Sequence, residues 1–201
     1  RGIKGKLNGS VKVEGSINDP SADGSLKLEE GRITLPRAGA TYGGMDGIMV
    51  FEDDEICLQH FRIRNGGNLN ASGKLEFASQ KPIGLDLEVN AVNFKAADTR
   101  DFRFIVNSNA RLQGPITSPE LKGEISFERG YYFLQNFGEK SVETIKLDTM
   151  NVGPTEDEIS LYDSLKIEMR LGLKPDFKVR NRKYADMEVG LQGQIDMLKE
   201  K

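Results

Sequence analysis

The side chains that could support catalysis or hold a metal ion are few and scattered in this chain. Cys57 is the only cysteine and His60 the only histidine among 201 residues. Together they would supply half of a tetrahedral zinc site, and no second cysteine or histidine exists to complete it. A lone cysteine also excludes an internal disulfide. We therefore predict no metal ion and no cofactor, and we interpret this segment as an ordinary strand.

Two other segments have the composition of ligand-binding loops without the required spacing. Residues 52–55 are all acidic but lack the D-x-D-x-D-G order of a calcium loop, so we expect a hairpin turn. Residues 39–47 are rich in glycine, but neither a lysine nor a helix follows as in a phosphate loop, so we interpret them as a strand crossover. No serine lies in a G-x-S-x-G elbow. We predict that the chain is not an enzyme.

The charge of the chain is slightly acidic, with a formal net value of −3. Nucleic-acid-binding domains usually carry a basic stripe, whereas the dense basic cluster here, residues 178–183, alternates and then turns like a solvated strand end. We predict no nucleic-acid partner. No apolar run approaches the length of about 18 residues that a membrane helix requires. Because the chain begins at Arg1 and still alternates near its end, we expect a fragment of a longer protein.

Alternation of apolar and charged residues runs through nearly the whole chain and predicts β-strands. Residues 26–29, 85–89 and 165–171 show it clearly. Successive side chains of a strand point to opposite faces, so each strand has one apolar face and one charged face. The best helical candidate, residues 95–101, is short and polar, and we interpret it as a loop. We predict an all-β fold with little or no helix.

Turn signals separate these runs at intervals of roughly ten residues, the spacing of an antiparallel meander or sandwich. They are Asn18–Pro20, Asn65–Gly67, Ser118–Pro119, Gly153–Pro154 and Lys174–Pro175.

An internal repeat relates residues 11–35 to residues 110–134 without a gap. Seven of the 25 aligned positions are identical, whereas ordinary composition would give about 1.5. A candidate third copy begins at residue 189 and is cut short. Repeated β units that contact only their neighbours build elongated sheets, so we expect an elongated antiparallel sheet.

The identical residues of the repeat have a physical interpretation as structural turns. Proline cannot continue a ladder because it lacks an N–H group, and glycine can supply a positive φ. We expect a tight turn or bulge at residues 29–31, followed by a third strand with Ile33 and Leu35. The predicted turn residues are Gly15, Pro20, Gly24 and Gly31 in the first copy and Gly114, Pro119, Gly123 and Gly130 in the second.

The order L-x-G-x-I-x-x-P-x-x-x-G-x-L-x-L-E-x-G-x-I resembles the C-terminal domain of the TamB family, the translocation and assembly module proteins. Residues 51–53, Gly66-Gly67 and the second copy, which closes at residues 129–131, add to the likeness. The resemblance extends from about Gly15 to Leu134, is weaker over residues 138–183 and returns at Leu191.

This resemblance implies a fold, a location and partners. TamB-like proteins are anchored in the inner membrane of Gram-negative bacteria by an N-terminal helix, which this sequence does not contain. They span the periplasm as a β structure curled into a taco-like groove with an apolar interior. They are similar to bridge-like lipid transfer proteins and act with an outer-membrane barrel protein of the TamA or BamA type. Residues 1–201 would then form one continuous piece of the C-terminal β domain, with phospholipids as ligands and no catalytic residues.

The apolar strand faces are the feature that could carry function. Under the resemblance, aliphatic and aromatic residues at alternate positions would line a lipid-binding groove. These residues are Leu26, Leu28, Ile33, Leu35, Leu75, Phe77, Leu85, Leu87, Val89, Ile125, Phe127, Leu165, Ile167, Met169 and Leu171.

Other uses of such faces stay open from sequence. Two sheets could pack face to face and bury the stripe as a sandwich core. The mostly aliphatic stripe, the absence of tryptophan and the repeat favour an open groove instead. A groove could carry phospholipid between the inner and outer membranes, or it could hold unfolded β segments during outer-membrane protein assembly and secretion. A structural β solenoid is a third reading, and a membrane barrel wall is disfavoured because aromatic girdles are not evident.

Overall fold

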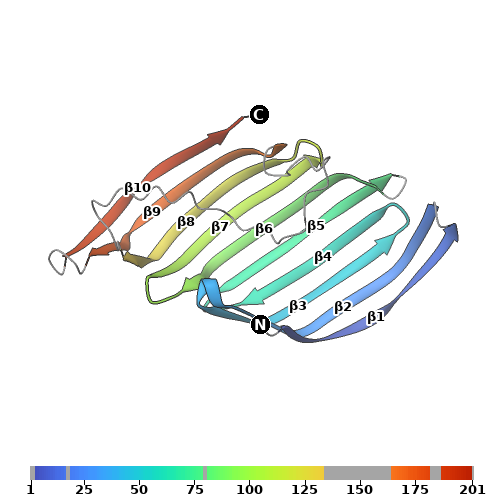
Figure 1. Ribbon diagram of the computed structural model, residues 1–201, viewed down its shortest axis with the longest axis horizontal. Helices are drawn as coiled ribbons and strands as arrows, with labels where there is room; N and C mark the ends of the chain where they lie inside the picture. Colours follow the sequence, from blue (N-terminus) through green and yellow to red (C-terminus); the bar gives the residue numbers. More distant parts are fainter. Residues whose placement is uncertain (1–2, 17–18, 79–80, 134–163, 182–186, 201) are drawn as a thin grey trace.

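The chain folds as a single ten-stranded sheet in which the strands follow their order in the sequence (Figure 1). The computed structural model describes residues 3–16, 19–78, 81–133, 164–181 and 187–200. The strands are β1 (Ile3–Ser16), β2 (Asp19–Leu35), β3 (Ala40–Glu52), β4 (Glu55–Arg64), β5 (Asn68–Ala78), β6 (Lys81–Asp98), β7 (Phe102–Pro115), β8 (Glu120–Phe133), β9 (Lys166–Asn181) and β10 (Met187–Lys199), and a short 3-10 helix, η1 (Pro36–Ala38), precedes β3.

Neighbouring strands pair in the antiparallel sense except at one place. β8 and β9 run parallel, and the residues that connect them, 134–163, lie outside the described part of the chain. Within that part, β1 pairs only with β2 and β10 only with β9, so the sheet does not close into a barrel. The predicted all-β, curled sheet is therefore confirmed, with one parallel pair in a sheet expected to be antiparallel throughout.

The strands end at two rims with different turns. One rim carries η1, the β4–β5 turn at residues 65–67 and the β6–β7 turn at residues 99–101, and we refer to it as the η1 rim. The opposite rim carries the β3–β4 turn at residues 53–54 and the β7–β8 turn at residues 116–119. The acidic hairpin predicted at residues 52–55 and the turns predicted at Asn65–Gly67 and Ser118–Pro119 are confirmed.

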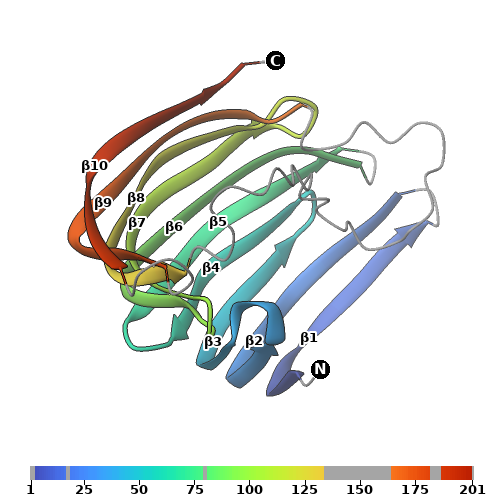
Figure 2. The ribbon, with the colours of Figure 1, turned by 60° about the vertical axis from the view of Figure 1, so that its left-hand side comes forward.

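Register shifts lie in a line across the sheet and crease it. In eight of the nine pairs of neighbouring strands, the hydrogen-bond register shifts in the middle of the strands or in the half nearer the η1 rim. In the remaining pair, β5/β6, the shift lies near the opposite rim. On β2 and β6 the residues with positive φ at this level are Glu30, with φ 52°, and Asn93, with φ 48°. A β-bulge bends its strand and increases the local twist, so bulges at one level bend the whole sheet. The result is the arched profile seen in Figure 2.

The bend brings together strands that are not neighbours. β6 continues past the short β4–β5 turn and touches β3 and η1. The Tyr42 hydroxyl donates a 2.5 Å hydrogen bond to the Ala96 carbonyl, and the Tyr42 ring stacks on Phe94 with centroids 5.7 Å apart. In a flat sheet, strands three places apart would be about 14 Å apart. The face on which β3 and β6 meet is therefore the concave face.

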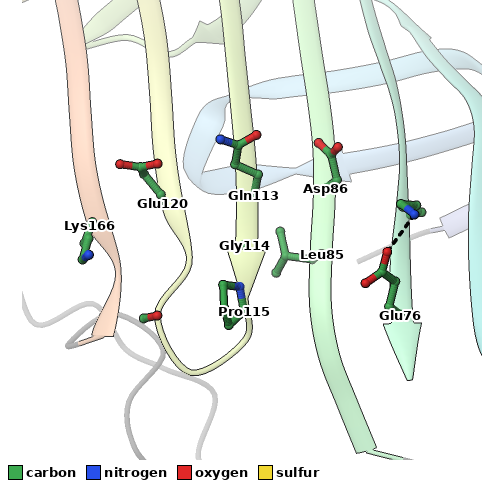
Figure 3. Close-up of a pocket in the computed structure, with 10 residues that line it drawn as sticks. Glu76, Leu85, Asp86, Gln113, Gly114, Pro115, Glu120 and Lys166 are labelled. Carbon is green, nitrogen blue, oxygen red and sulfur yellow. Dashed lines mark ion pairs between the residues drawn. The ribbon is translucent and has the colours of Figure 1, made fainter. Parts of the chain in front are cut away.

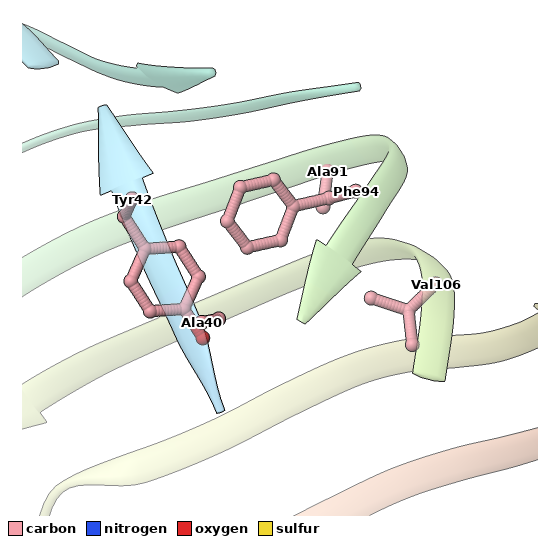
Figure 4. Packing of buried hydrophobic residues seen from close by; sticks show 5 residues of the cluster. All are labelled: Ala40, Tyr42, Ala91, Phe94 and Val106. Atoms are coloured by element: carbon pink, nitrogen blue, oxygen red, sulfur yellow. The ribbon is translucent and has the colours of Figure 1, made fainter. Parts of the chain in front are cut away.

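A small buried cluster holds this contact. Its buried members come from β3, β6 and β7 and are Ala40, Tyr42, Ala91, Phe94 and Val106 (Figure 4). Residues of β2, β4, β5, β7 and β8 pack against it, among them Ile33, Leu69 and Phe127. Every strand from β2 to β8 thus contributes to the cluster, which stabilises the curl by burying apolar surface.

Equivalent glycines of the two repeat copies have similar backbone conformations in two of the three pairs, and most of these glycines do not lie at turns. Gly24 and Gly123 have φ 145° and 143°, and a Cβ atom on either would lie 2.1 Å from the carbonyl oxygen of the facing strand. Both lie inside strands, so the prediction that they form turns was wrong. Gly31 and Gly130 also lie inside strands but border register shifts, in agreement with the bulge expected there as the alternative to a turn. Where two backbones approach this closely on the concave side, no side chain fits.

The remaining repeat positions lie near strand ends. Gly15 and Gly114 have φ 94° and 110° at the ends of β1 and β7, and Pro119 is fully buried in the β7–β8 turn. Pro20 is the second residue of β2. In the candidate third copy, Gly193 lies in the middle of β10 rather than at its end.

Several segments predicted as breaks are continuous strand. Residues 29–31 form a bulge inside β2 rather than the end of a strand, and Glu30 rather than Gly31 carries the positive φ. The segment predicted as a crossover, residues 39–47, mostly belongs to β3, and residues 95–98 belong to β6 rather than to a loop. Pro175 lies within β9 near the crease. Asn18 and Gly153–Pro154 are outside the described residues.

We expect Gly123→Ala to destabilise the fold by about 1–3 kcal/mol, because its Cβ atom would meet the Asn109 carbonyl oxygen at 2.1 Å in a strained backbone conformation. Gly193→Ala is the matched control, since no atom lies within 4 Å of its Cβ position, and should change stability by less than about 0.5 kcal/mol. Urea unfolding followed by circular dichroism measures both values. Equal effects would show that the close approach at Gly123 is not limiting.

Removing the ring of Phe94 should destabilise the sheet by about 3–5 kcal/mol, the usual cost of truncating a buried phenylalanine. Phe94 is only 5% exposed and forms the contact with Tyr42. Val92→Ala, at a position 58% exposed on the same strand, serves as control and should have little effect. A small loss for Phe94→Ala would mean that the β3–β6 contact does not hold the curl.

Candidate functional site

A row of paired apolar residues crosses the concave face from one edge of the sheet to the other. Residues that are direct partners in the register lie on the same face, so the row can be followed strand by strand. From β1 to β10 its members are Leu7, Leu28, Gly47, Phe61, Ala71, Val89, Ala110, Gly123, Met169 and Met197. We call this row the concave ladder. It contains no charged or polar residue.

The structure places the predicted lining residues on this face. The predicted residues on β2, β5, β6, β8 and β9 lie on the concave face, because they either pair directly with other concave residues or alternate with them along the same strand. Leu165 lies just before β9 and is half-buried. Their placement on one face follows from the register, while their role in lipid binding stays a prediction.

Sequence reasoning missed four members of a second apolar row, which lies beside the concave ladder. This row includes Met49, Leu58, Leu112 and Leu121, which lie between Leu26 on β2 and Ile167 on β9. Residues 48–51 are apolar at every position, so alternation alone could not assign Met49 to a face. The repeat could have identified Leu112, because it aligns with Val13.

The concave face consists of two bands of different composition. Aromatic rings gather near the η1 rim, where Phe104 stacks on Phe102 and Phe177 with centroid distances of 5.1 and 6.0 Å. Phe127 meets both Phe104 and Phe177 edge-on. Phe94 and Phe177 are 5% and 7% exposed, so this aromatic band is filled by the protein's own side chains. It was not predicted, since the rings are far apart in the sequence.

The second band, on the opposite-rim side of the crease, is aliphatic and only partly covered. Its residues on the central strands are half-buried, and Met49 is 36% exposed. Toward the edges Leu7 and Met197 are 65% and 42% exposed. The residues that the structure describes form one sheet, so the alternative of two sheets packed face to face does not hold for this part of the chain. We call this surface the aliphatic band.

Small residues give the aliphatic band room to curve. On the concave ladder, Gly47 faces Phe61, whose ring would lie 2.9 Å from a Cβ atom on Gly47. Ala71, Ala110 and Gly123 occupy the same row. The inside of a bent sheet has less space per residue than the outside, so small residues between large ones allow the bend without collision.

The convex face carries ion pairs between neighbouring strands. Lys74 on β5 lies 3.0 Å from Glu55 and 2.7 Å from Glu76. Arg111 on β7 donates two hydrogen bonds to Asp86 on β6, of 2.7 and 2.5 Å. Exposed pairs of this kind add little stability. The ion pairs do, however, favour the observed register of the strands. A slip by one residue would move every charged side chain to the concave face and every apolar one to the convex face.

Other pairs continue the pattern toward β10. Lys122 lies 3.0 Å from Glu120 and 3.2 Å from Glu168, and Arg170 lies 3.1 Å from Asp196. The convex face of β5–β10 is therefore largely neutralised by partners within the sheet.

These contacts shift several pKa values. The hydrogen bonds from Arg111 lower the pKa of Asp86, and the bond from Arg103 lowers that of Asp98, with Lys95 adding to it. The Cys57 thiol donates a 2.8 Å hydrogen bond to Glu55, which raises the pKa of the thiol. A thiol held protonated is a poor nucleophile and a poor metal ligand.

A cavity of about 480 Å³ lies at the opposite rim, over β5 to β9 (Figure 3). Charged and amide side chains of the convex face, such as Asp86, Gln113, Glu120 and Lys166, line it. Glu76 there is paired with Lys74. Among the described residues, no three histidine, cysteine, aspartate or glutamate side chains gather where they could hold a metal ion. The cavity is therefore part of the charged convex face.

Comparison with known families gives one match. The model of the TamB C-terminal domain matches residues 59–201. Searches among curated proteins and among solved structures found no match. In the described part of the chain, no helix is long and apolar enough to cross a membrane.

We expect stability to fall below about pH 4, because Asp86 and Asp98 have pKa values below the unfolded value of about 4. A lowered pKa contributes stability that is present above the unfolded pKa and is lost as the pH falls through the folded pKa. The Asp86→Asn, Asp98→Asn double variant should lose less stability between pH 5 and pH 2 than the parent chain. Thermal unfolding across this range measures the difference. Parallel curves would show that these pairs do not govern acid sensitivity.

Proposed function

Because the chain belongs to the TamB C-terminal domain family, we propose that it is a non-catalytic lipid conduit. Membership of this family supports a role in TamB-type lipid or protein transport in the Gram-negative envelope. The proposal goes further: phospholipid acyl chains lie on the aliphatic band and move across the strands between the inner and outer membranes.

The observation that carries this proposal is the unbroken apolar concave ladder. Ten strands at a spacing of about 4.8 Å make the aliphatic band roughly 40 Å long across the sheet. Each buried CH₂ group contributes about 0.8 kcal/mol, so an acyl chain binds through contact area alone. A uniform apolar surface also has no deep well along its length, which suits movement along it. Such a surface supplies no direction, so net transport needs a gradient or a partner.

The two bands of the concave face divide the work. The aromatic band is already filled and holds the strands together near the η1 rim. Acyl chains would therefore occupy the aliphatic band, with Leu26, Leu87, Leu112 and Ile167 among the residues that contact them. Ion pairs on the convex face keep the outside in water.

The partners of this proposal are those of TamB-type transport. An outer-membrane barrel protein of the TamA or BamA type would receive the lipid, and a membrane helix outside this sequence would anchor the protein to the inner membrane. The chain itself would lie in the periplasm. No metal or cofactor is required.

A second function, a chaperone for outer-membrane β-barrel segments, is favoured by the sheet edges. β1 and β10 each have one unpaired side in the described structure, and Leu7 and Ile195 on them are 65% and 58% exposed. An extended client segment could add to such an edge through backbone hydrogen bonds.

Photo-crosslinking in cells tests the conduit. A crosslinking residue at Leu87, on the concave face, should capture phospholipid, whereas one at the neighbouring Glu88, on the convex face, should not. Lipid adducts are identified by mass spectrometry of the purified protein. Equal labelling at both positions would contradict the proposal. Adducts at Leu87 made only of outer-membrane barrel precursors, with no lipid in native mass spectra, would favour the chaperone.

A further inference from the structure

One region of the convex face gathers three arginines that form no ion pair within the described residues. On β2 and β4, near the η1 rim, Arg32, Arg62 and Arg64 are exposed and have no acidic partner within salt-bridge distance among the described residues. Arg62 donates instead to the amide oxygen of Asn70, at 3.2 Å. The arginines Arg111 and Arg170 on β7 and β9 each have a carboxylate partner.

Two of these arginines lie over the same glycine pair. The Arg32 Nε atom is 3.7 Å from the position of a Cβ atom on Gly43, and the Arg64 side-chain carbons are 3.4–3.5 Å from that on Gly44. Arg32 reaches this place from β2 and Arg64 from β4, with β3 between them. Two cationic side chains thus lie beside one short strip of backbone, and a carboxylate bound there would be attracted to both.

The strip has an apolar continuation along β3. Ile48 and Val50 lie on the convex face, where their register partners are polar or charged, such as Lys27 and His60 for Ile48. Both are half-buried. Apolar side chains next to arginines are typical of protein–protein interfaces and less common on the rest of a protein surface.

The acidic groups of the region leave the arginines available. Glu30 is 3.1 Å from Lys6 and Glu29 is 2.7 Å from Lys27. Asp46 faces Arg62 in the register without forming an ion pair, and its Oδ2 atom is buried without a hydrogen-bond partner.

From this arrangement we infer that the convex face of β2–β4 binds an acidic, extended segment of a partner protein. We call the surface the arginine patch, formed by Arg32, Gly43, Gly44, Ile48, Arg62 and Arg64. Carboxylates of the segment would lie between Arg32 and Arg64, and its apolar side chains would contact Ile48. The glycine pair gives the backbone of the segment room to approach.

An anionic membrane fits the patch less well. Recognition of anionic lipid headgroups usually takes a cluster of about four to eight basic residues. The patch has three arginines on a chain with a formal net charge of −3, and the residues that continue it along β3, Ile48 and Val50, are apolar. The inference is independent of the conduit, because the patch is on the face opposite the aliphatic band.

Fluorescence anisotropy with two labelled eight-residue peptides, one alternating Glu with Val and one alternating Lys with Val, tests the inference. The Glu-Val peptide should bind and the Lys-Val peptide should not. Arg32→Gln with Arg64→Gln should weaken binding by about tenfold or more, the range of close interfacial charge pairs. The control pair, Arg129→Gln with Arg170→Gln, removes the same charge from β8 and β9 and should change binding less than about twofold.

Three outcomes would overturn the inference: no binding of the Glu-Val peptide, equal loss in both double variants, or tighter binding to vesicles of phosphatidylglycerol and phosphatidylethanolamine than to the peptide. Circular dichroism checks that both variants fold. Lipid content measured by native mass spectrometry should be the same in the patch variant and the parent, so failure of this test is distinguishable from failure of the conduit.

Discussion

Each strand of this sheet has to bend near the same level, and the line of register shifts across the sheet is what permits it. A bulge releases one residue from the ladder and bends its strand, but a single bulge would only distort one edge. Because the shifts recur from β1 to β10, the sheet bends as a whole. Burial of Tyr42 against Phe94 then holds the bend, and the division between a concave and a convex face follows from it.

The two faces oppose each other chemically, and that opposition protects the register. Apolar residues on the concave face and ion pairs on the convex face alternate along most of the strands, so a slip by one residue would place charges inside and leucines outside. The fully buried apolar side chains lie mostly in and around the aromatic band, while the aliphatic band stays partly uncovered. This arrangement separates the part that holds the fold from the part that is free to bind, and both the conduit and the chaperone proposals depend on it.

Alternation of apolar and charged residues correctly predicted which face of the sheet a side chain lies on. Turn-like composition was a poor guide to where a strand ends. Alternation around Leu85–Val89 and Lys166–Leu171 assigned those residues correctly to one face. Glu29–Gly31, Gly39–Gly47 and Lys174–Pro175 have the composition of turns or crossovers, and the structure uses them within or beside continuous strands. A bulge and a turn need the same glycine, proline and acidic residues, and what separates them is whether a partner strand continues alongside.

The sequence by itself determined that the protein is built of one-sided strands and that residues 11–35 and 110–134 share one pattern. These properties depend on the two-residue alternation and on the amino-acid composition, both of which can be read from short stretches of neighbouring residues. Only the tertiary structure decided which face is concave, that the rings of Tyr42, Phe94, Phe104 and Phe177 gather at one rim, and that Arg32 and Arg64 share a glycine pair. Those facts depend on the curl, which brings together residues from different strands and which no single stretch of sequence specifies.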